Sequence, residues 1–181
     1  MNWRFHQMWF GLSLFLALIL LEPIGANPGN FRSSPETLVK RGHDLARLGI
    51  PYNFGGVTNA GMDCSASVQR FYKALGVTLP RNSEAQAHHL AKQGRLFRVA
   101  PWETEEEVLA RLQTGDLLFW TKKGEPNRIS HVMVYVNHHA STVRLWGARG
   151  KGKTGMNGSG VDFHNYRPRR SGKLVAYGSP R

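Results

Sequence analysis

The chain has 181 residues, a single cysteine and a formal net charge of +12 at pH 7. One cysteine cannot form an internal disulfide, which excludes a small scaffold held together by disulfides. The strong positive charge predicts attraction to a polyanion such as nucleic acid, anionic lipid or an acidic cell-wall polymer.

The first residues have the pattern of an export signal. Arg4 precedes an apolar run, residues 8–21, that is short for a membrane span. Small residues then lead to Ala26 as the expected last residue of the signal. We therefore predict a signal peptide at 1–26 and one domain at 27–181, exported to the periplasm or the cell exterior and without a membrane span after cleavage. An uncleaved signal anchor is the alternative.

Helical patterns fill the first half of the predicted domain. Ser33 with Glu36 three residues later forms a capping-box pattern, which predicts a helix over 33–48. Thr104 and Glu107 repeat this pattern, which predicts a short helix that begins at these residues. Further segments in this half are expected as a turn-rich loop at 50–62 and helices at 64–75 and 83–93.

Strand patterns fill the second half. Apolar runs and alternating patterns predict short strands separated by turns, and the segment 122–128 is predicted as a charged loop. The expected strands are residues 97–102, 116–121, 129–136, 142–146, 161–163 and 173–177. Because helices come first and antiparallel strands second, the order predicts an α+β fold and not an alternating βαβ fold.

Cys64 stands where the glycine-rich loop meets the helix at 64–75. A helix N-terminus carries partial positive charge, which favours a thiolate over a thiol. Polar residues flank the cysteine, Asp63 before it and Ser65 after it. Two interpretations follow: a nucleophile, or one of the many single cysteines that are small buried hydrophobic residues.

A thiol nucleophile needs a base, and His131 is the best candidate. It lies near the start of the strand predicted at 129–136. The alternative is a half-buried strand histidine without a catalytic role. The order Cys64 then His131, on a helix and then a sheet, is the layout of papain-like peptidases.

Five pieces of the sequence, in matching order, resemble the NlpC-type peptidoglycan cysteine peptidases, a papain-like family. They are Tyr52 to Gly56, Asp63 to Val68, Leu79 to Ser83 with Gln86, Gly115 to Phe119, and Ser130 to Val136.

The resemblance implies a papain-like α+β fold, with the Cys64 helix packed on an antiparallel sheet of about five strands. It implies cleavage of an amide in the stem peptides of peptidoglycan, commonly between D-glutamate and the diamino acid. By position, Cys64 is the nucleophile and His131 the base. The residues implied to line the substrate groove are Tyr52, Asp63, Ser65, Arg81 and Ser83.

The sequence departs from the family pattern at two positions. Ala66 replaces a usual glycine, which is a mild change inside a helix. Gly147 occupies the position of a third polar residue, usually histidine, that orients the base. The orienting group therefore stays open between His139, His164, Asn137, a backbone carbonyl and no group at all.

Residues 147–154 match the phosphate-loop pattern, but the glycine-rich run that follows cannot start the helix that such a site needs. The histidine pairs at 88–89 and 138–139 do not predict a metal site, because adjacent side chains point apart. No cofactor is expected.

These features predict an exported, monomeric cell-wall hydrolase that works through Cys64 and His131. Its basic surface is expected to contact an anionic wall polymer. A wall-binding protein with a degenerate site and a thiol acyltransferase of the same superfamily are the alternatives. A nucleic-acid binder has only the charge in its favour.

Overall fold

The computed structural model describes residues 33–139, 142–150, 154–167 and 172–181, without the side chain of His139. The predicted signal peptide at 1–26 lies outside these ranges, as do residues 151–153 of the phosphate-loop-like run and most of the basic turn at 167–170. Within the described ranges, no helix is both long enough and apolar enough to cross a membrane.

The helices of the described chain form close to where the sequence predicts them. Their bounds are α1 Pro35–Ala46, α2 Cys64–Lys73, α3 Ser83–Lys92 and α4 Glu105–Leu109. The predicted capping box of Thr104 and Glu107 at α4 is confirmed.

The predicted cap of α1 is displaced by one residue. Ser34, not Ser33, accepts the N–H of Thr37 through its side chain. Pro35 follows it at the first helical position, where its fixed φ suits the helix and its missing N–H costs nothing. Because the residue before a proline avoids the helical region, Ser34 is the extended cap.

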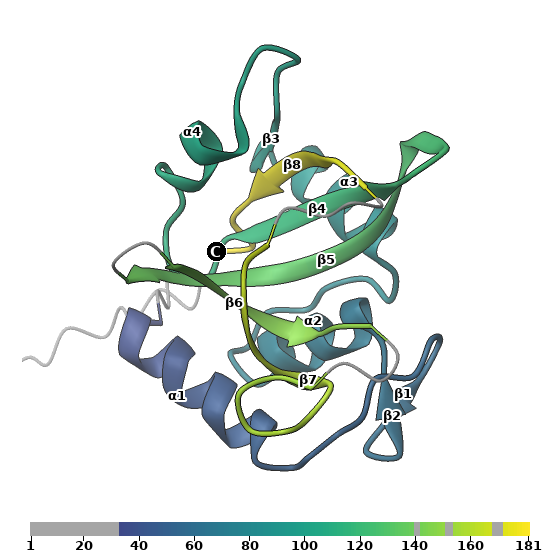
Figure 1. The fold of residues 1–181 in the computed structure, drawn as a ribbon, viewed down its shortest axis with the longest axis vertical. Helices are drawn as coiled ribbons and strands as arrows, with labels where there is room; N and C mark the ends of the chain where they lie inside the picture. Colours follow the sequence, from purple (N-terminus) through teal and green to yellow (C-terminus); the bar gives the residue numbers. More distant parts are fainter. Residues whose placement is uncertain (1–32, 140–141, 151–153, 168–171) are drawn as a thin grey trace, which may run out of the picture. The chain divides into compact units, whose positions relative to one another are not determined.

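Six strands of the described chain form one antiparallel sheet, in the order β3-β8-β4-β5-β6-β7 (Figure 1). The strands are β3 Leu96–Arg98, β4 Leu117–Lys122, β5 Glu125–His139, β6 Thr142–Ala148, β7 Val161–Asn165 and β8 Leu174–Gly178. The α+β class predicted from the sequence is confirmed, and the sheet has the six strands that the sequence pattern predicts, where the resemblance implied about five. After β7 the chain crosses the sheet, and β8 inserts between β3 and β4.

Two predicted loops contain strands. The charged loop at 122–128 continues the β4–β5 hairpin, in which Lys122 pairs with Glu125. The loop at 50–62 contains a two-stranded hairpin, β1 Val57–Thr58 and β2 Gly61–Met62. Strands this short carry no readable alternation, so the sequence pattern does not show them.

The sheet is covered on both faces, which explains why its central strands are continuously apolar. Leu117 and Phe119 of β4 pack in one core with residues of α1, α2 and α3. Leu118 and Trp120 pack in a second core with residues of α4. Because successive side chains of a strand point to opposite faces, both sets of alternate residues are buried.

Candidate active site

Cys64 is the first residue of α2, and Asp63 is its N-cap. The predicted position of the cysteine at a helix N-terminus is therefore confirmed. The residue is 7% exposed and belongs to the core between the helices and the sheet. The aligned peptide dipoles of α2 place partial positive charge at this end, which favours a thiolate.

Asp63, Ser65 and Arg81, which the sequence assigns to the substrate groove, come together at the start of α2. Arg81 donates to Oδ1 of Asp63 from Nη1 at 3.0 Å and to Oδ2 from Nη2 at 2.8 Å. Arg81 Nη1 also donates to Ser65 Oγ at 2.9 Å, and Ser65 Oγ donates to Asp63 Oδ1 at 3.1 Å. The three side chains form one closed network next to Cys64.

Asp63 also fixes the backbone around the cysteine. Its carboxylate accepts the N–H of Ala66 at 2.8 Å and that of Gly55 at 3.2 Å. Burial opposes ionisation of the Asp63 carboxyl, but the hydrogen bonds from Arg81, Ala66 and Ser65 outweigh it and hold its pKa below the ordinary value. Asp63 is therefore a fixed anion that ties the glycine-rich loop to α2.

Ser67 joins the first turn of α2 to the sheet. Its hydroxyl donates to the carbonyl oxygen of Cys64 at 2.7 Å and accepts the N–H of Ala148 in β6 at 3.0 Å. Ser67 is 1% exposed. The helix turn that carries the cysteine is thus hydrogen-bonded to a strand of the sheet.

His131 lies on β5, directly opposite Trp120 of β4. The two ring centroids are 5.6 Å apart, and His131 is 7% exposed. The helix α2 packs against β5. An imidazole held between a long strand and an indole has little freedom to rotate, which suits a group that must accept a proton at one place.

Tyr52 and Ser83 sit on the segments that border this region. Tyr52 forms a bridge with Met62, the residue before Asp63. Ser83 begins α3, and its hydroxyl donates to the carbonyl oxygen of Ile129, two residues before His131, at 3.4 Å. Each is tied to the chain next to a proposed catalytic residue.

Gly147, at the position of the usual third polar residue, has φ +147°. A Cβ atom built there would lie 3.7 Å from its nearest neighbours, which is ordinary contact. His164 Nε2 is 3.1 Å from the carbonyl oxygen of Gly147 and 3.3 Å from that of Gly160. Since both partners are acceptors, Nε2 carries the proton, and burial lowers the pKa of His164. His164 is a neutral donor to the backbone.

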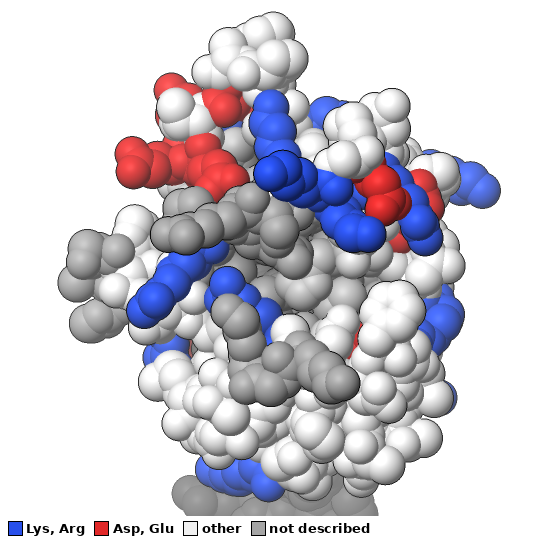
Figure 2. All heavy atoms as spheres, turned by 45° about the vertical axis from the view of Figure 1, so that its right-hand side comes forward, with Lys and Arg blue, Asp and Glu red and all other residues white. Residues whose placement is uncertain are grey.

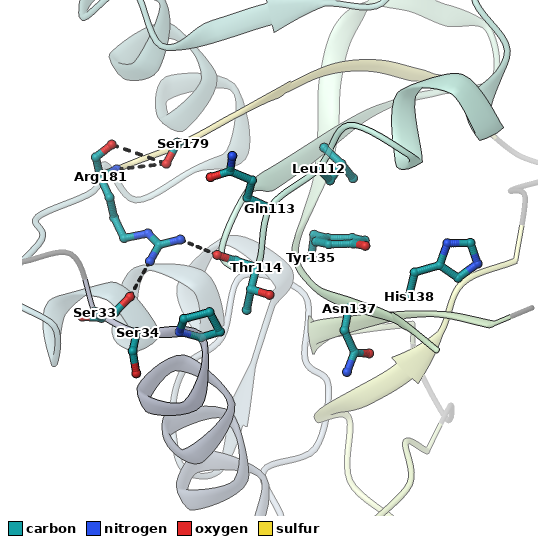
Figure 3. Close-up of a pocket in the computed structure, with 11 residues that line it drawn as sticks. Ser33, Ser34, Leu112, Gln113, Thr114, Tyr135, Asn137, His138, Ser179 and Arg181 are labelled. Atoms are coloured by element: carbon teal, nitrogen blue, oxygen red, sulfur yellow. Dashed lines mark hydrogen bonds between the residues drawn. The ribbon is translucent and has the colours of Figure 1, made fainter. Parts of the chain in front are cut away.

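Asn137 lies at the other end of β5, six residues beyond His131 and opposite Arg144. Six residues of strand span about 20 Å, so Asn137 is too far along β5 to bond the His131 ring. Its side chain lines a pocket of about 700 Å³, together with Tyr135 and His138 (Figure 3). In that pocket Arg181 donates to the carbonyl oxygen of Ser33 at 2.9 Å. None of the proposed site residues lines it.

Three residues with contacts around the site are not among the predicted site residues. Ser67 follows Cys64 by three positions, a helical spacing that places both on neighbouring parts of one face. Gln86 is fully buried and donates to the carbonyl oxygens of Ser65 and Pro80 at 3.0 and 2.9 Å. Trp120 is found only through strand pairing, which no local pattern reveals.

Within the described residues, no three side chains among His, Cys, Asp and Glu are grouped as a metal site. The candidate site combines the Cys64 thiol, the His131 imidazole and the Asp63–Arg81 carboxylate–guanidinium pair.

Residues 49–165 match the model of the NlpC/P60 family. Over 110 residues the chain is 36% identical to a probable endopeptidase of Haemophilus influenzae, covering 58% of each chain. Over 89 residues it is 34% identical to a gamma-D-glutamyl-L-lysine dipeptidyl-peptidase of Bacillus subtilis, covering 49% of this chain and 25% of that protein. The chain thus spans less than two thirds of either relative.

A solved structure gives the same fold. An NlpC/P60 family protein from Bacillus cereus superimposes with a TM-score of 0.51 at 23% identity, over 80% of this chain and 39% of that one. At this identity the likeness concerns the fold alone.

Proposed function

Because the chain belongs to the NlpC/P60 family, we propose that it is a cysteine peptidase that cleaves an amide bond in the stem peptides of peptidoglycan. One observation carries the proposal: Asp63 and Ser65, the residues on either side of Cys64, form a network with Arg81 at the positive end of α2. A partly buried ionic network costs desolvation energy and is not needed around a cysteine that only fills space, whereas it suits a polar substrate beside a thiolate.

In the proposed reaction, the Cys64 thiolate attacks the carbonyl carbon of the amide. The N–H groups at the start of α2, with the Tyr52 hydroxyl, stabilise the oxyanion. His131 accepts the thiol proton and passes it to the leaving amine as the tetrahedral intermediate collapses to a thioester. Water, deprotonated by His131, then hydrolyses the thioester and restores the thiol.

The acyl side of the substrate lies, in this proposal, against Asp63, Ser65 and Arg81. A carboxylate and a guanidinium held in fixed positions suit a peptide that carries both an amine and a carboxylate. The Bacillus subtilis relative is named for a bond between gamma-D-glutamate and L-lysine, which is a diamino acid. We place the cleaved bond of this chain there as well, with Tyr52 and Ser83 completing the groove.

The group that orients the His131 imidazole stays open in this proposal. Gly147 offers no side chain, and His164 donates Nε2–H to backbone carbonyls. We therefore assign the chemistry to the dyad of Cys64 and His131, with Trp120 packed against the imidazole.

In the same proposal, the protein is exported and its basic surface contacts an anionic wall polymer. The net charge is +12. Figure 2 shows basic side chains spread over one face of the molecule, with a compact acidic group at its upper left. Attraction between such a face and an anionic polymer weakens as salt is added.

The test is digestion of purified peptidoglycan, with the released fragments identified by mass. Wild type is expected to release stem-peptide fragments ending at D-glutamate, and Cys64→Ala or His131→Gln to reduce the rate by about 10⁴-fold. Equal rates in wild type and Cys64→Ala would eliminate the thiol mechanism. Wall binding without any release of fragments would favour the alternative of a binding protein with a degenerate site.

A further inference from the structure

Trp120 of β4 pairs with two other aromatic rings, His131 of β5 and Tyr166, the residue after β7. Its ring centroid is 5.6 Å from that of His131 and 6.4 Å from that of Tyr166. Both separations lie in the range in which aromatic rings attract each other, about 4.5–7 Å. Trp120 is 1% exposed. A buried indole therefore links the proposed base to a tyrosine that the site described above does not use.

Tyr166 is held at both ends. Its backbone N–H donates to the carbonyl oxygen of Val143 in β6 at 2.7 Å, and its hydroxyl donates to Oε2 of Glu105. Burial raises the pKa of the Tyr166 hydroxyl, and the Glu105 carboxylate raises it further, so the hydroxyl remains a neutral donor. The two hydrogen bonds restrict how the phenol ring can move.

Glu105 is the first residue of α4, and this helix is fixed to the sheet. The capping box of Thr104 and Glu107 holds its first turn. Val108 and Leu109, three and four residues after Glu105, are buried in the second core. Residues at these spacings lie on one side of a helix, so Glu105 is on the side of α4 that faces the sheet. The anchor of the Tyr166 hydroxyl is therefore itself well placed.

In the described part of the chain, no hydrogen bond of good geometry fixes the Trp120 indole, whose Nε1 is buried. The indole N–H is nonetheless near enough to the Tyr166 hydroxyl to offset part of the rise in that group's pKa. The orientation of the indole therefore depends on the groups packed against it. Tyr166 is an anchored member of that set.

Tyr177 of β8 provides a comparison, because both tyrosines pack against the second core. The Tyr177 ring stacks on Phe97 with centroids 5.4 Å apart. Among the described residues, no ring contact joins Tyr177 to Trp120 or His131. A role in core packing is thus common to both tyrosines, whereas the link to the His131 ring belongs to Tyr166.

We infer that Tyr166 is a positioning residue: anchored by Glu105, it fixes the Trp120 indole and, through it, the imidazole of His131. The inference rests on the proposed function, in which His131 is the base. An imidazole with fewer accessible orientations keeps its nitrogen for longer at the place where the thiol proton is taken up. Displacing a reacting group by about 1 Å can cost about 10²-fold in rate, even when the mutation is remote.

The test measures kcat and KM for soluble stem peptides prepared from purified peptidoglycan. Tyr166→Ala is expected to lower kcat by about 10- to 100-fold and to leave KM within about twofold. Tyr166→Phe and Glu105→Ala each remove only the bond between hydroxyl and carboxylate, and each should lower kcat by about 3- to 10-fold. Glu105→Gln keeps an acceptor oxygen and should retain most of the wild-type rate.

A double variant and two controls sharpen the test. Tyr166→Phe combined with Glu105→Ala should be no slower than either single variant, because both changes remove the same bond. Tyr177→Ala removes the comparison tyrosine and should keep kcat. Glu106→Ala, an exposed change in the same turn of α4, should keep it as well.

NMR of the His131 ring reports its position without any substrate. Its ring C–H resonances are assigned by their loss in His131→Gln, and the neighbouring indole of Trp120 shifts them. Tyr166→Ala should move them toward the values of an exposed histidine such as His88. Tyr177→Ala should leave them in place, although it lowers stability.

The outcomes separate this inference from the proposed function. A wild-type kcat in Tyr166→Ala, a loss in KM alone, unmoved His131 resonances, or equal effects of Tyr166→Ala and Tyr177→Ala would overturn the positioning role and leave the hydrolase intact. If wild type cleaves no stem peptide, the proposed function fails, and the His131 resonances alone decide whether Tyr166 positions the ring. If Tyr166→Ala does not fold, Tyr166→Phe and Glu105→Ala answer the same questions.

Discussion

Arg81 holds Asp63 through two parallel hydrogen bonds, 3.0 Å from Nη1 to Oδ1 and 2.8 Å from Nη2 to Oδ2. The pair joins residues 18 positions apart and lies directly before Cys64. Arg81 Nη2 also donates to the carbonyl oxygen of Gly55 at 3.1 Å, so the same guanidinium ties the glycine-rich loop to the start of α2.

Replacing Arg81 is therefore expected to impair both stability and activity. Arg81→Gln leaves the largely buried Asp63 carboxylate without its cation, which should cost about 1–3 kcal/mol in unfolding free energy and at least about tenfold in kcat/KM. Arg81→Lys keeps the charge but not the paired donors, so its unfolding free energy and its kcat/KM should lie between those of wild type and of Arg81→Gln. Urea denaturation and peptide hydrolysis measure the two effects.

The control for this experiment is Lys40→Gln. Lys40 forms an exposed i,i+4 ion pair with Asp44 at 2.9 Å, a kind of pair that contributes at most about 0.5 kcal/mol. Equal effects of Arg81→Gln and Lys40→Gln would show that the Asp63–Arg81 pair has no special role.

The depressed pKa of Asp63 also predicts how stability depends on pH. The carboxylate contributes stability that is fully present above its unfolded pKa of about 3.9 and is lost as the pH falls through its lower folded pKa. Asp63→Asn should flatten this part of the curve of unfolding free energy against pH. An unchanged curve between pH 5 and pH 2 would contradict the assignment.

Ser67→Ala is expected to destabilise the fold by about 1–3 kcal/mol, because it leaves the buried N–H of Ala148 without its acceptor. It also removes the bond to the carbonyl oxygen of Cys64. Ser67→Thr keeps the hydroxyl and serves as the comparison in thermal denaturation. If Ser67→Ala is as stable as wild type, this bond does not hold α2 to β6.

Gly147 is expected to resist substitution for a backbone reason. At φ +147° an L side chain is strained, although a Cβ atom would have room. Gly147→Ala should therefore cost about 1–3 kcal/mol, and Gly147→His should cost a similar amount without raising kcat. A Gly147→His variant that is stable and faster than wild type would show that the missing side chain alone limits the site.

His164 predicts a pH dependence near neutrality. Burial lowers its folded pKa below the unfolded value of about 6.5, so the unfolded chain binds the proton more readily. The unfolding free energy should fall as the pH drops through 6.5 toward the folded pKa. His164→Gln keeps a donor for the carbonyl oxygens and should remove this slope, whereas exposed His88→Gln should keep it. Urea denaturation at pH 8 and pH 5 measures both slopes.

The sequence by itself determined the helices, the apolar strands and the position of Cys64. These depend on neighbours in the chain: Asp63 caps α2, and Thr104 and Glu107 form their box within one turn. Local capping and periodicity act over a few residues, so a pattern reveals them. The cap of α1 shows how far such patterns can be trusted. Both Ser33 and Ser34 are suitable caps, and Pro35 favours Ser34.

Only the tertiary structure decided which distant side chains meet. Arg81 reaches Asp63 because α3 folds back on the sheet, and Ser67 reaches Ala148 across 81 residues of sequence. The crossing after β7, which places β8 between β3 and β4, leaves no local signal. Such contacts depend on the packing of whole elements, whose free energy is shared among many residues, and so no short stretch of sequence specifies them.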